Sequence, residues 1–268
     1  MLIRQPHVAG TFYPSDPGEL RQFCDTHLKT PLPSVAAKAV VLPHAGYIYS
    51  GKTAAKVLSH VSIPNRVFLI GPNHFGQGAL FALASQGAWH TPLGEVPIDE
   101  PMAQGLLKAC DDLQPDAEAH LFEHSLEVEI PFLQVRNPSL KILPLIVGSL
   151  DLLAAKQAAL ACGRFLSTLA EPPLVVVSTD MSHYESDVRT RQKDKFALEA
   201  IRNLDEDALA KAVKDYRITM CGFVPVYMLL VMKTFLGITK ATLVDYCTSA
   251  DATGDYDRVV GYAGFILE

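Results

Sequence analysis

The sequence has few of the features that mark secreted or membrane-spanning proteins. Its start, MLIRQPHVAG, lacks the charged region and the following apolar stretch of about 7–15 residues that a secretory signal needs. The most apolar later stretch, FVPVYMLLVMKTFLGI, is interrupted by Pro225 and Lys233 and is shorter than the roughly 20 apolar residues that span a bilayer. We therefore expect a cytoplasmic protein without a membrane anchor, and we interpret the apolar stretch as a buried helix.

Basic clusters are also absent, and the formal net charge is -6 at pH 7. Nucleic acids and anionic membranes bind surfaces on which Lys and Arg are clustered. We therefore expect neither of them as a partner. Composition and charge do not determine the oligomeric state.

The sequence contains no CxxC pair, and its five cysteines are dispersed, which excludes a disulfide framework and fits a reducing compartment. The HExxH motif and the HxE motif with PCxxC are absent as well, so the common signatures of zinc hydrolases and deaminases are missing. Cys110 and Cys162 fall in helical patterns and Cys247 in a strand-like run, where packing is the expected role.

The chain alternates between strand-like and helix-like segments. With 268 residues and 49% hydrophobic content, it can bury one large α/β core. The alternation predicts a three-layer α/β/α sandwich with a central mixed, mostly parallel sheet. Residues 1–268 are expected to form one domain, in which residues 1–37 are an N-terminal arm and TPLPSVAAK (30–38) is a linker.

Hydrophobic periodicity places the individual elements. Strands are expected at residues 38–43, 66–71, 79–85, 141–148, 174–180, 241–250 and 258–267. Helices are expected at residues 51–61, 100–110, 124–135 and 151–170, and helical patterns run over residues 187–235. Residues 91–99 read as a turn-rich connection, and Pro131 as a kink or an early stop. The last two strands are joined by the short loop DATGDYD and are expected to pair antiparallel.

Histidines recur just beyond the ends of apolar strands. VVLPHAGY contains His44, FLIGPNHFG contains His74, and VVVSTDMSHY contains Asp180 and His183. The carboxyl ends of parallel strands meet at one edge of a sheet, which is the usual ligand-binding edge of open α/β folds. The sequence therefore predicts that these side chains converge on one crevice.

Two further segments carry candidate site residues. In EHSLEVE, Glu123 and His124 are expected to orient a ligand or to bind substrate, whereas Glu127 and Glu129 read as an acidic, solvated helix start. In TMCGFVP, Cys221 precedes a helix, a position expected to lower the pKa of a thiol and to make it a nucleophile or a metal ligand.

Together these motifs resemble the Memo family, which is also described as the B component of the AmmeMemoRadiSam system. The resemblance rests on VAGTFYP, PHAGYIYSG, GPNHFG, EHSLEVEIPFL, STDMSHY and the cysteine of MCG, in this order along nearly the whole chain. It implies a single α/β/α domain similar to class III extradiol ring-cleavage dioxygenases, whose non-haem iron lies at the edge of the sheet.

By motif match, the resemblance implies that His44, His74 and Cys221 are metal ligands and that Asp180 and His183 are pocket groups beside them. In the related dioxygenases the third ligand is a carboxylate, whereas this chain has a thiol. Fe(II) is the first expectation for the metal and copper the second. Zinc ranks behind them, although a thiolate also suits Cu(I) and zinc.

Aromatic residues near these motifs are candidates for the lining of an apolar cleft, although rings near strand ends pack into cores more often than they contact ligands. Tyr47 is counted among the groups that contact substrate, and Tyr49, Phe75 and Tyr184 are further candidates for an apolar lining.

Three functional hypotheses follow from these residues. The first is a metal-dependent redox enzyme in which His183, oriented by Asp180, transfers protons. The second is a metal-free enzyme in which Cys221 attacks a carbonyl and His183 and Asp180 activate it. The third comes from the resemblance, because some relatives are described as recognising peptides or serving as adaptors: a non-catalytic binding module whose pocket is an inherited relic. The partner is accordingly expected to be a small molecule or a peptide. The substrate stays open, because the shape of a pocket cannot be read from periodicity.

Overall fold

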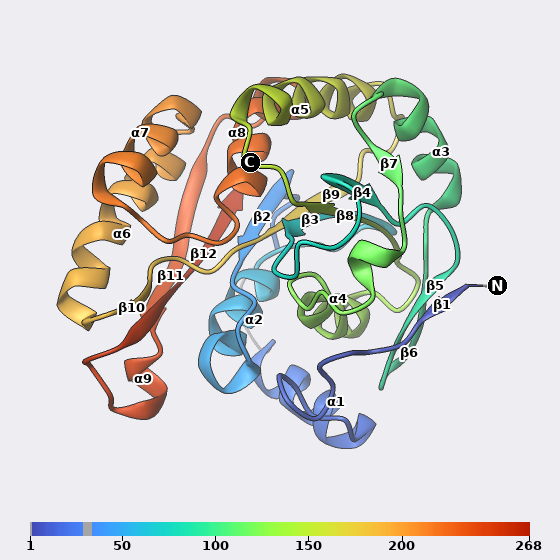
Figure 1. Ribbon diagram of the computed structural model, residues 1–268. Helices are drawn as coiled ribbons and strands as arrows, with labels where there is room; N and C mark the ends of the chain where they lie inside the picture. The colour runs from blue at the N-terminus through green and yellow to red at the C-terminus, as the bar shows by residue number, and fades with distance from the viewer. Residues whose placement is uncertain (1, 29–33) are drawn as a thin grey trace.

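The computed structural model describes residues 2–28 and 34–268, so only part of the expected linker at residues 30–38 lies within it. In these residues a nine-stranded sheet has the order β10-β12-β2-β9-β3-β8-β4-β7, and β11 pairs with β12. Helices cover both faces: α8 and α5 lie on one, and α2 and α4 on the other (Figure 1). The expected α/β/α sandwich is confirmed.

The strands of the large sheet are β2 (Ala39–Leu42), β3 (Arg66–Pro72), β4 (Phe81–Leu83), β7 (Gln114–Pro115), β8 (Lys141–Val147), β9 (Leu174–Ser178), β10 (His183–Glu185), β11 (Ala241–Thr248) and β12 (Val259–Leu267). A separate three-stranded sheet is formed by β1 (Ile3–Arg4), β5 (Ala88–Thr91) and β6 (Gly94–Pro97).

The α-helices are α1 (Pro17–His27), α2 (Lys52–Ser59), α3 (Glu100–Ala109), α4 (Ile130–Arg136), α5 (Leu152–Ser167), α6 (Asp187–Arg202), α7 (Glu206–Tyr216), α8 (Phe223–Leu236) and α9 (Ala250–Thr253). Shorter helical turns are a π-helix, η1 (Tyr47–Gly51), and two 3-10 turns, η2 (Glu118–His120) and η3 (Glu127–Glu129).

The centre of the large sheet is parallel. Strands β2, β9, β3 and β8 pair parallel, with Leu42 opposite Ser178 and Ile70 opposite Val177. Helices cover both faces of these strands, so nearly all of their residues are buried and their sequences are continuously apolar. β12 runs antiparallel to both β2 and β11, as expected for the C-terminal pair.

Aspartates fix the starts of several helices. Asp16, Asp99, Asp151 and Asp205 accept hydrogen bonds from backbone N–H groups in the first turns of α1, α3, α5 and α7. Such caps satisfy donors that have no partner inside the helix.

The apolar segment near the C-terminus forms α8, a buried helix, as expected. α8 ends at Leu236 and is capped by Gly237, whose φ of 67° is in the left-handed region that glycine tolerates. Of the helices within the described residues, none has the length and apolarity that a membrane crossing requires.

Two local predictions were wrong. Residues 88–97 form the β5–β6 hairpin, and residues 91–99 are therefore not merely a connection. The helix expected from residue 124 begins as a 3-10 turn and becomes α-helical only at Ile130. Pro131 lies in the first turn of α4, where its missing N–H removes no helical hydrogen bond.

The expected solvation of Glu127 was also wrong, because this side chain is completely buried. Its carboxylate forms an ion pair with Arg4 at 2.8 Å and accepts hydrogen bonds from the backbone N–H groups of His7 and Val8 and from the Tyr13 hydroxyl. Four donors from the N-terminal segment therefore converge on one carboxylate. This interaction attaches residues 4–13 to the segment that precedes α4.

Replacing Arg4 with methionine is expected to destabilise the fold by about 3–5 kcal/mol, because the Glu127 carboxylate stays buried without its cation. Denaturant unfolding measures this change. The matched control is Arg189→Met, which removes a largely exposed cation from Glu185 and leaves its ion pair with Lys193, and is expected to cost less than about 1 kcal/mol. Equal losses in the two variants would contradict the role assigned to Arg4.

Candidate metal centre

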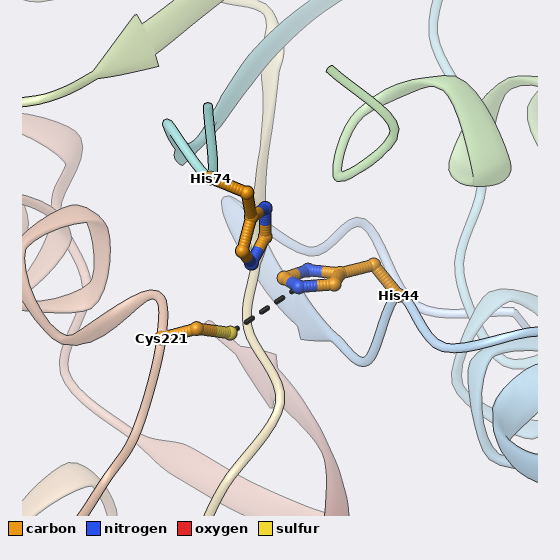
Figure 2. A group of neighbouring side chains, drawn as sticks. All are labelled: His44, His74 and Cys221. Carbon is orange, nitrogen blue, oxygen red and sulfur yellow. Dashed lines mark hydrogen bonds between the residues drawn. The ribbon is translucent and has the colours of Figure 1, made fainter. Parts of the chain in front are cut away.

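The parallel strands deliver three segments to one edge of the sheet. His44 follows β2 by two residues, His74 follows β3 by two residues, and Ser178 is the last residue of β9 between them. Cys221 arrives from the segment before α8. Figure 2 shows the side chains of His44, His74 and Cys221 pointing toward one another.

The ligand atoms of His44, His74 and Cys221 all lie within 4.8 Å of one another. His44 Nε2 is 3.2 Å from Cys221 Sγ, and the two imidazole rings are nearly perpendicular, with centroids 5.1 Å apart. Two imidazoles and a thiol in this arrangement are a donor set for a transition-metal ion. A second group with the same spacing consists of His74, Glu123 and His124.

The approach of Cys221 depends on the glycine that follows it. A Cβ atom on Gly222 would lie 2.4 Å from the carbonyl oxygen of Ser178, so a larger residue would push the loop away from the end of β9. The Gly222 N–H donates to Thr179 Oγ1 at 2.9 Å, and the Asp180 N–H donates to Cys221 Sγ at 3.2 Å. Backbone contacts thus hold the thiol beside His44.

Glu123 fixes the orientation of His74. This buried carboxylate accepts hydrogen bonds from the His74 backbone N–H at 2.6 Å and from His74 Nδ1 at 2.9 Å, which leaves His74 Nε2 free. Burial acts to raise the pKa of Glu123, but hydrogen bonds and the electrostatic interaction with the His74 side chain lower it to about 2. His124 stacks on His74 with ring centroids 4.6 Å apart.

His44 is held by two hydrogen bonds on its buried side. Its Nδ1 is 2.6 Å from Ser178 Oγ, and its backbone N–H donates to Asp180 Oδ1 at 2.8 Å. Burial lowers the pKa of His44 well below its usual value, and the neighbouring histidines lower it further. His44 is therefore a neutral imidazole at pH 7, the form that binds metals.

A cavity of about 440 Å³ lies beside His44 and His74. Its walls include four histidines and one aspartate: His44, His74, His124, His183 and Asp180. The remaining walls include four aromatic side chains, Phe12, Tyr49, Tyr184 and Tyr262. Sequence reasoning missed Phe12 and Tyr262; the VAGTFYP motif could have pointed to the first, whereas nothing in the apolar run of β12 marks the second.

Tyr47 does not belong to this cavity wall, which corrects its expected substrate contact. Its side chain is buried, its hydroxyl donates to the Val128 carbonyl at 2.7 Å, and its ring stacks on Phe132 with centroids 4.5 Å apart. Tyr47 is thus a core residue, and its neighbour Tyr49 faces the cavity.

Asp180 does not orient His183, contrary to expectation. Asp180 Oδ1 is bonded to the His44 backbone, whereas His183 Nδ1 lies 2.8 Å from the Thr219 carbonyl oxygen and its backbone N–H donates to Thr219 Oγ1. Because a carbonyl only accepts, Nδ1 carries the proton of neutral His183 and Nε2 is its free base. Burial raises the pKa of Asp180 to about 7.

The thiol of Cys221 is not activated in the expected way. Burial and the nearby Asp180 raise its pKa, although it precedes the first turn of α8. With His183 bonded to Thr219, the expected triad of Cys221, His183 and Asp180 is not assembled. The geometry instead presents a protonated thiol beside the Nε2 atom of a neutral His44.

The fold and the site define an α/β/α protein with a two-histidine, one-cysteine centre at the edge of its sheet. The family described as Memo-like protein matches residues 4–266, so the chain belongs to the Memo family. It is 44% identical to a MEMO1 family protein of Aquifex aeolicus, with 100% of both chains covered, and 39% identical to MEMO1 family protein MK0963 of Methanopyrus kandleri, with 99% of each covered.

A solved structure supports the fold. The chain is similar to an uncharacterized protein, JW3007, of Escherichia coli K12, with a TM-score of 0.53 and 14% identity over 84% of this chain and 98% of the other. At this identity the likeness extends to the fold alone.

The raised pKa of Cys221 predicts slow alkylation in the metal-free protein. Iodoacetamide at pH 7 is expected to label Cys221 at least about tenfold more slowly than an unhindered cysteine, because only the thiolate reacts, and the rate is expected to rise with pH above 9. Peptide mapping by mass spectrometry follows the label. The control is Cys221→Ser, which reports labelling at the other cysteines, and rapid labelling at neutral pH would favour the nucleophilic enzyme instead.

Proposed function

We propose that His44, His74 and Cys221 hold a redox-active metal ion and that the protein carries out metal-dependent redox chemistry on a small molecule in the aromatic cavity. The observation that carries this proposal is the convergence of three donor atoms, within 4.8 Å of one another, from three separate segments of the chain.

The donor set fits a transition metal. His44 is neutral and offers Nε2, Glu123 leaves Nε2 of His74 free, and Cys221 supplies a sulfur that becomes a thiolate ligand on binding. Fe(II) is the first proposal and copper the second, because either metal would supply one-electron chemistry when bound. Zinc fits the same donors but would not supply redox chemistry.

The chain's own residues prepare the cavity for a substrate. A volume of about 440 Å³ is within the range of small-molecule sites, and the four aromatic walls favour a flat, partly apolar compound. His183 Nε2 is the free base on the cavity wall, so His183 is proposed to take a proton from a bound hydroxyl group. Asp180 Oδ1 accepts a hydrogen bond from the His44 backbone N–H and so holds His44 at the edge of the cavity.

Elemental analysis of protein purified anaerobically, without chelator or metal-affinity tag, tests the metal. We expect near-stoichiometric iron or copper in the wild type and a loss of at least about tenfold in both His44→Ala and Cys221→Ser, because each removes a donor. The matched control is His60→Ala, which alters a histidine bonded within its own helix to the Lys56 carbonyl and is expected to retain the metal.

Spectroscopy of the loaded protein tests the redox role. A thiolate ligand to Fe(III) or Cu(II) is expected to give a charge-transfer absorption that Cys221→Ser abolishes. Full metal content in His44→Ala would refute the ligand assignment, and exclusive occupancy by zinc would refute the redox role. If the protein takes up no Fe(II), Cu(I) or Zn(II), the non-catalytic peptide-binding module becomes the better interpretation.

A further inference from the structure

Glu129 is a buried carboxyl group with almost no compensation. Its exposed fraction is 1%, although the sequence suggested a solvated helix start. Glu129 Oε1 accepts a hydrogen bond from Ser178 Oγ at 3.3 Å, and Oε2 has no partner within the described residues. Burial raises the pKa of this carboxyl well above its usual value. Burying a carboxyl group without hydrogen-bond partners destabilises the fold, so its presence here calls for an explanation other than stability.

The hydrogen bond from Ser178 connects Glu129 to the metal centre. Ser178 Oγ lies 2.6 Å from His44 Nδ1, and His44 Nε2 lies 3.2 Å from Cys221 Sγ. Glu129, Ser178 and His44 each have an exposed fraction of 1% or less, so the chain of atoms is shielded from water.

The direction of these hydrogen bonds follows from the first of them, in which Ser178 Oγ–H is the donor and Glu129 Oε1 the acceptor. Oε1 accepts whether Glu129 is ionised or carries its proton on Oε2, the oxygen without a partner within the described residues. When Ser178 Oγ–H donates to Glu129 Oε1, the lone pairs of Oγ are left to accept from His44 Nδ1–H. The proton of neutral His44 then lies on Nδ1, and Nε2 keeps its lone pair. Without an acceptor at position 129, the Ser178 hydroxyl is free to donate to Nδ1, which places the proton of His44 on Nε2.

We propose that Glu129 is a positioning residue that acts through Ser178 to hold the proton of His44 on Nδ1 and so keeps Nε2 free to bind a metal. The effect on the tautomer stands on the geometry of the three buried residues, and its consequence for metal affinity rests on the proposed function. Partners of this kind orient metal-binding histidines, and their loss lowers metal affinity about 10- to 100-fold.

The first experiment reads the tautomer of His44 in the metal-free protein from its imidazole 15N chemical shifts. The wild type is expected to carry the proton on Nδ1, and Glu129→Leu is expected to populate the Nε2-protonated form. Glu129→Gln keeps an acceptor oxygen and is expected to restore the wild-type tautomer. A proton on Nε2 in the wild type, or an unchanged tautomer in Glu129→Leu, would overturn the proposal.

The second experiment titrates the same proteins anaerobically with Fe(II) and Cu(I). Glu129→Leu and Ser178→Ala are each expected to lower the affinity about 10- to 100-fold. The double variant is expected to lose no more than the larger single loss, because both residues act through one path. Additive losses of affinity in the double variant would contradict a path from Glu129 through Ser178 to His44.

Two controls distinguish an effect on the His44 tautomer from a general loss of stability. Ser182→Ala removes another buried serine hydroxyl, one without a partner within the described residues, and is expected to change neither tautomer nor affinity. Unfolding curves of every variant check stability independently. If the wild type binds no metal, the proposed function fails, and the tautomer measurement still decides whether Glu129 positions His44.

Discussion

Parallel pairing of β9 with both β2 and β3 is the constraint on which the site depends. Because Leu42 lies opposite Ser178 and Val177 opposite Ile70, the three strands end at nearly the same level. Two more residues then bring His44 and His74 to the two sides of Ser178. A shift of one strand by a single residue would turn its side chains to the other face of the sheet and separate these groups.

The sequence was informative where the signal is local. Apolar, β-branched runs predicted the central strands, and the histidines beyond them predicted a site at one edge, because both depend only on neighbouring residues and strand direction. The acidic segment was misread, since local charge pattern cannot reveal that Arg4 and Ser178 reach it from distant parts of the chain. Tyr47 was expected in the cavity wall but is a core residue, and Tyr262 was missed although it lines the cavity, because tertiary packing decides which ring faces the cavity.

The three acids Glu123, Glu127 and Glu129 lie within one short segment, all buried, yet their environments differ. Glu127 is compensated by a cation and three further donors, and Glu123 by His74 and the Ser125 backbone N–H. Glu129 has one long hydrogen bond. Glu127 and Glu123 are thus compensated, whereas Glu129 is not, and burial raises the pKa of Glu129 well above its usual value. Glu127 attaches the N-terminal segment, whereas the other two act on the histidines.

A likeness at 14% identity extends only to the fold, so the proposed chemistry rests on the donor set. The third donor beside the two histidines is a thiol, Cys221. Its position is built by backbone contacts: Gly222 packs on the Ser178 carbonyl, and the Asp180 N–H points at the sulfur. A carboxylate in place of the thiol would face this N–H equally well, but its oxygens reach one bond farther toward His44 Nε2, which is already 3.2 Å from the sulfur. The loop at Cys221 and Gly222 therefore fits the shorter side chain of cysteine. Packing against the end of β9 thus explains the sulfur donor at this position as well as the chemistry of the site does.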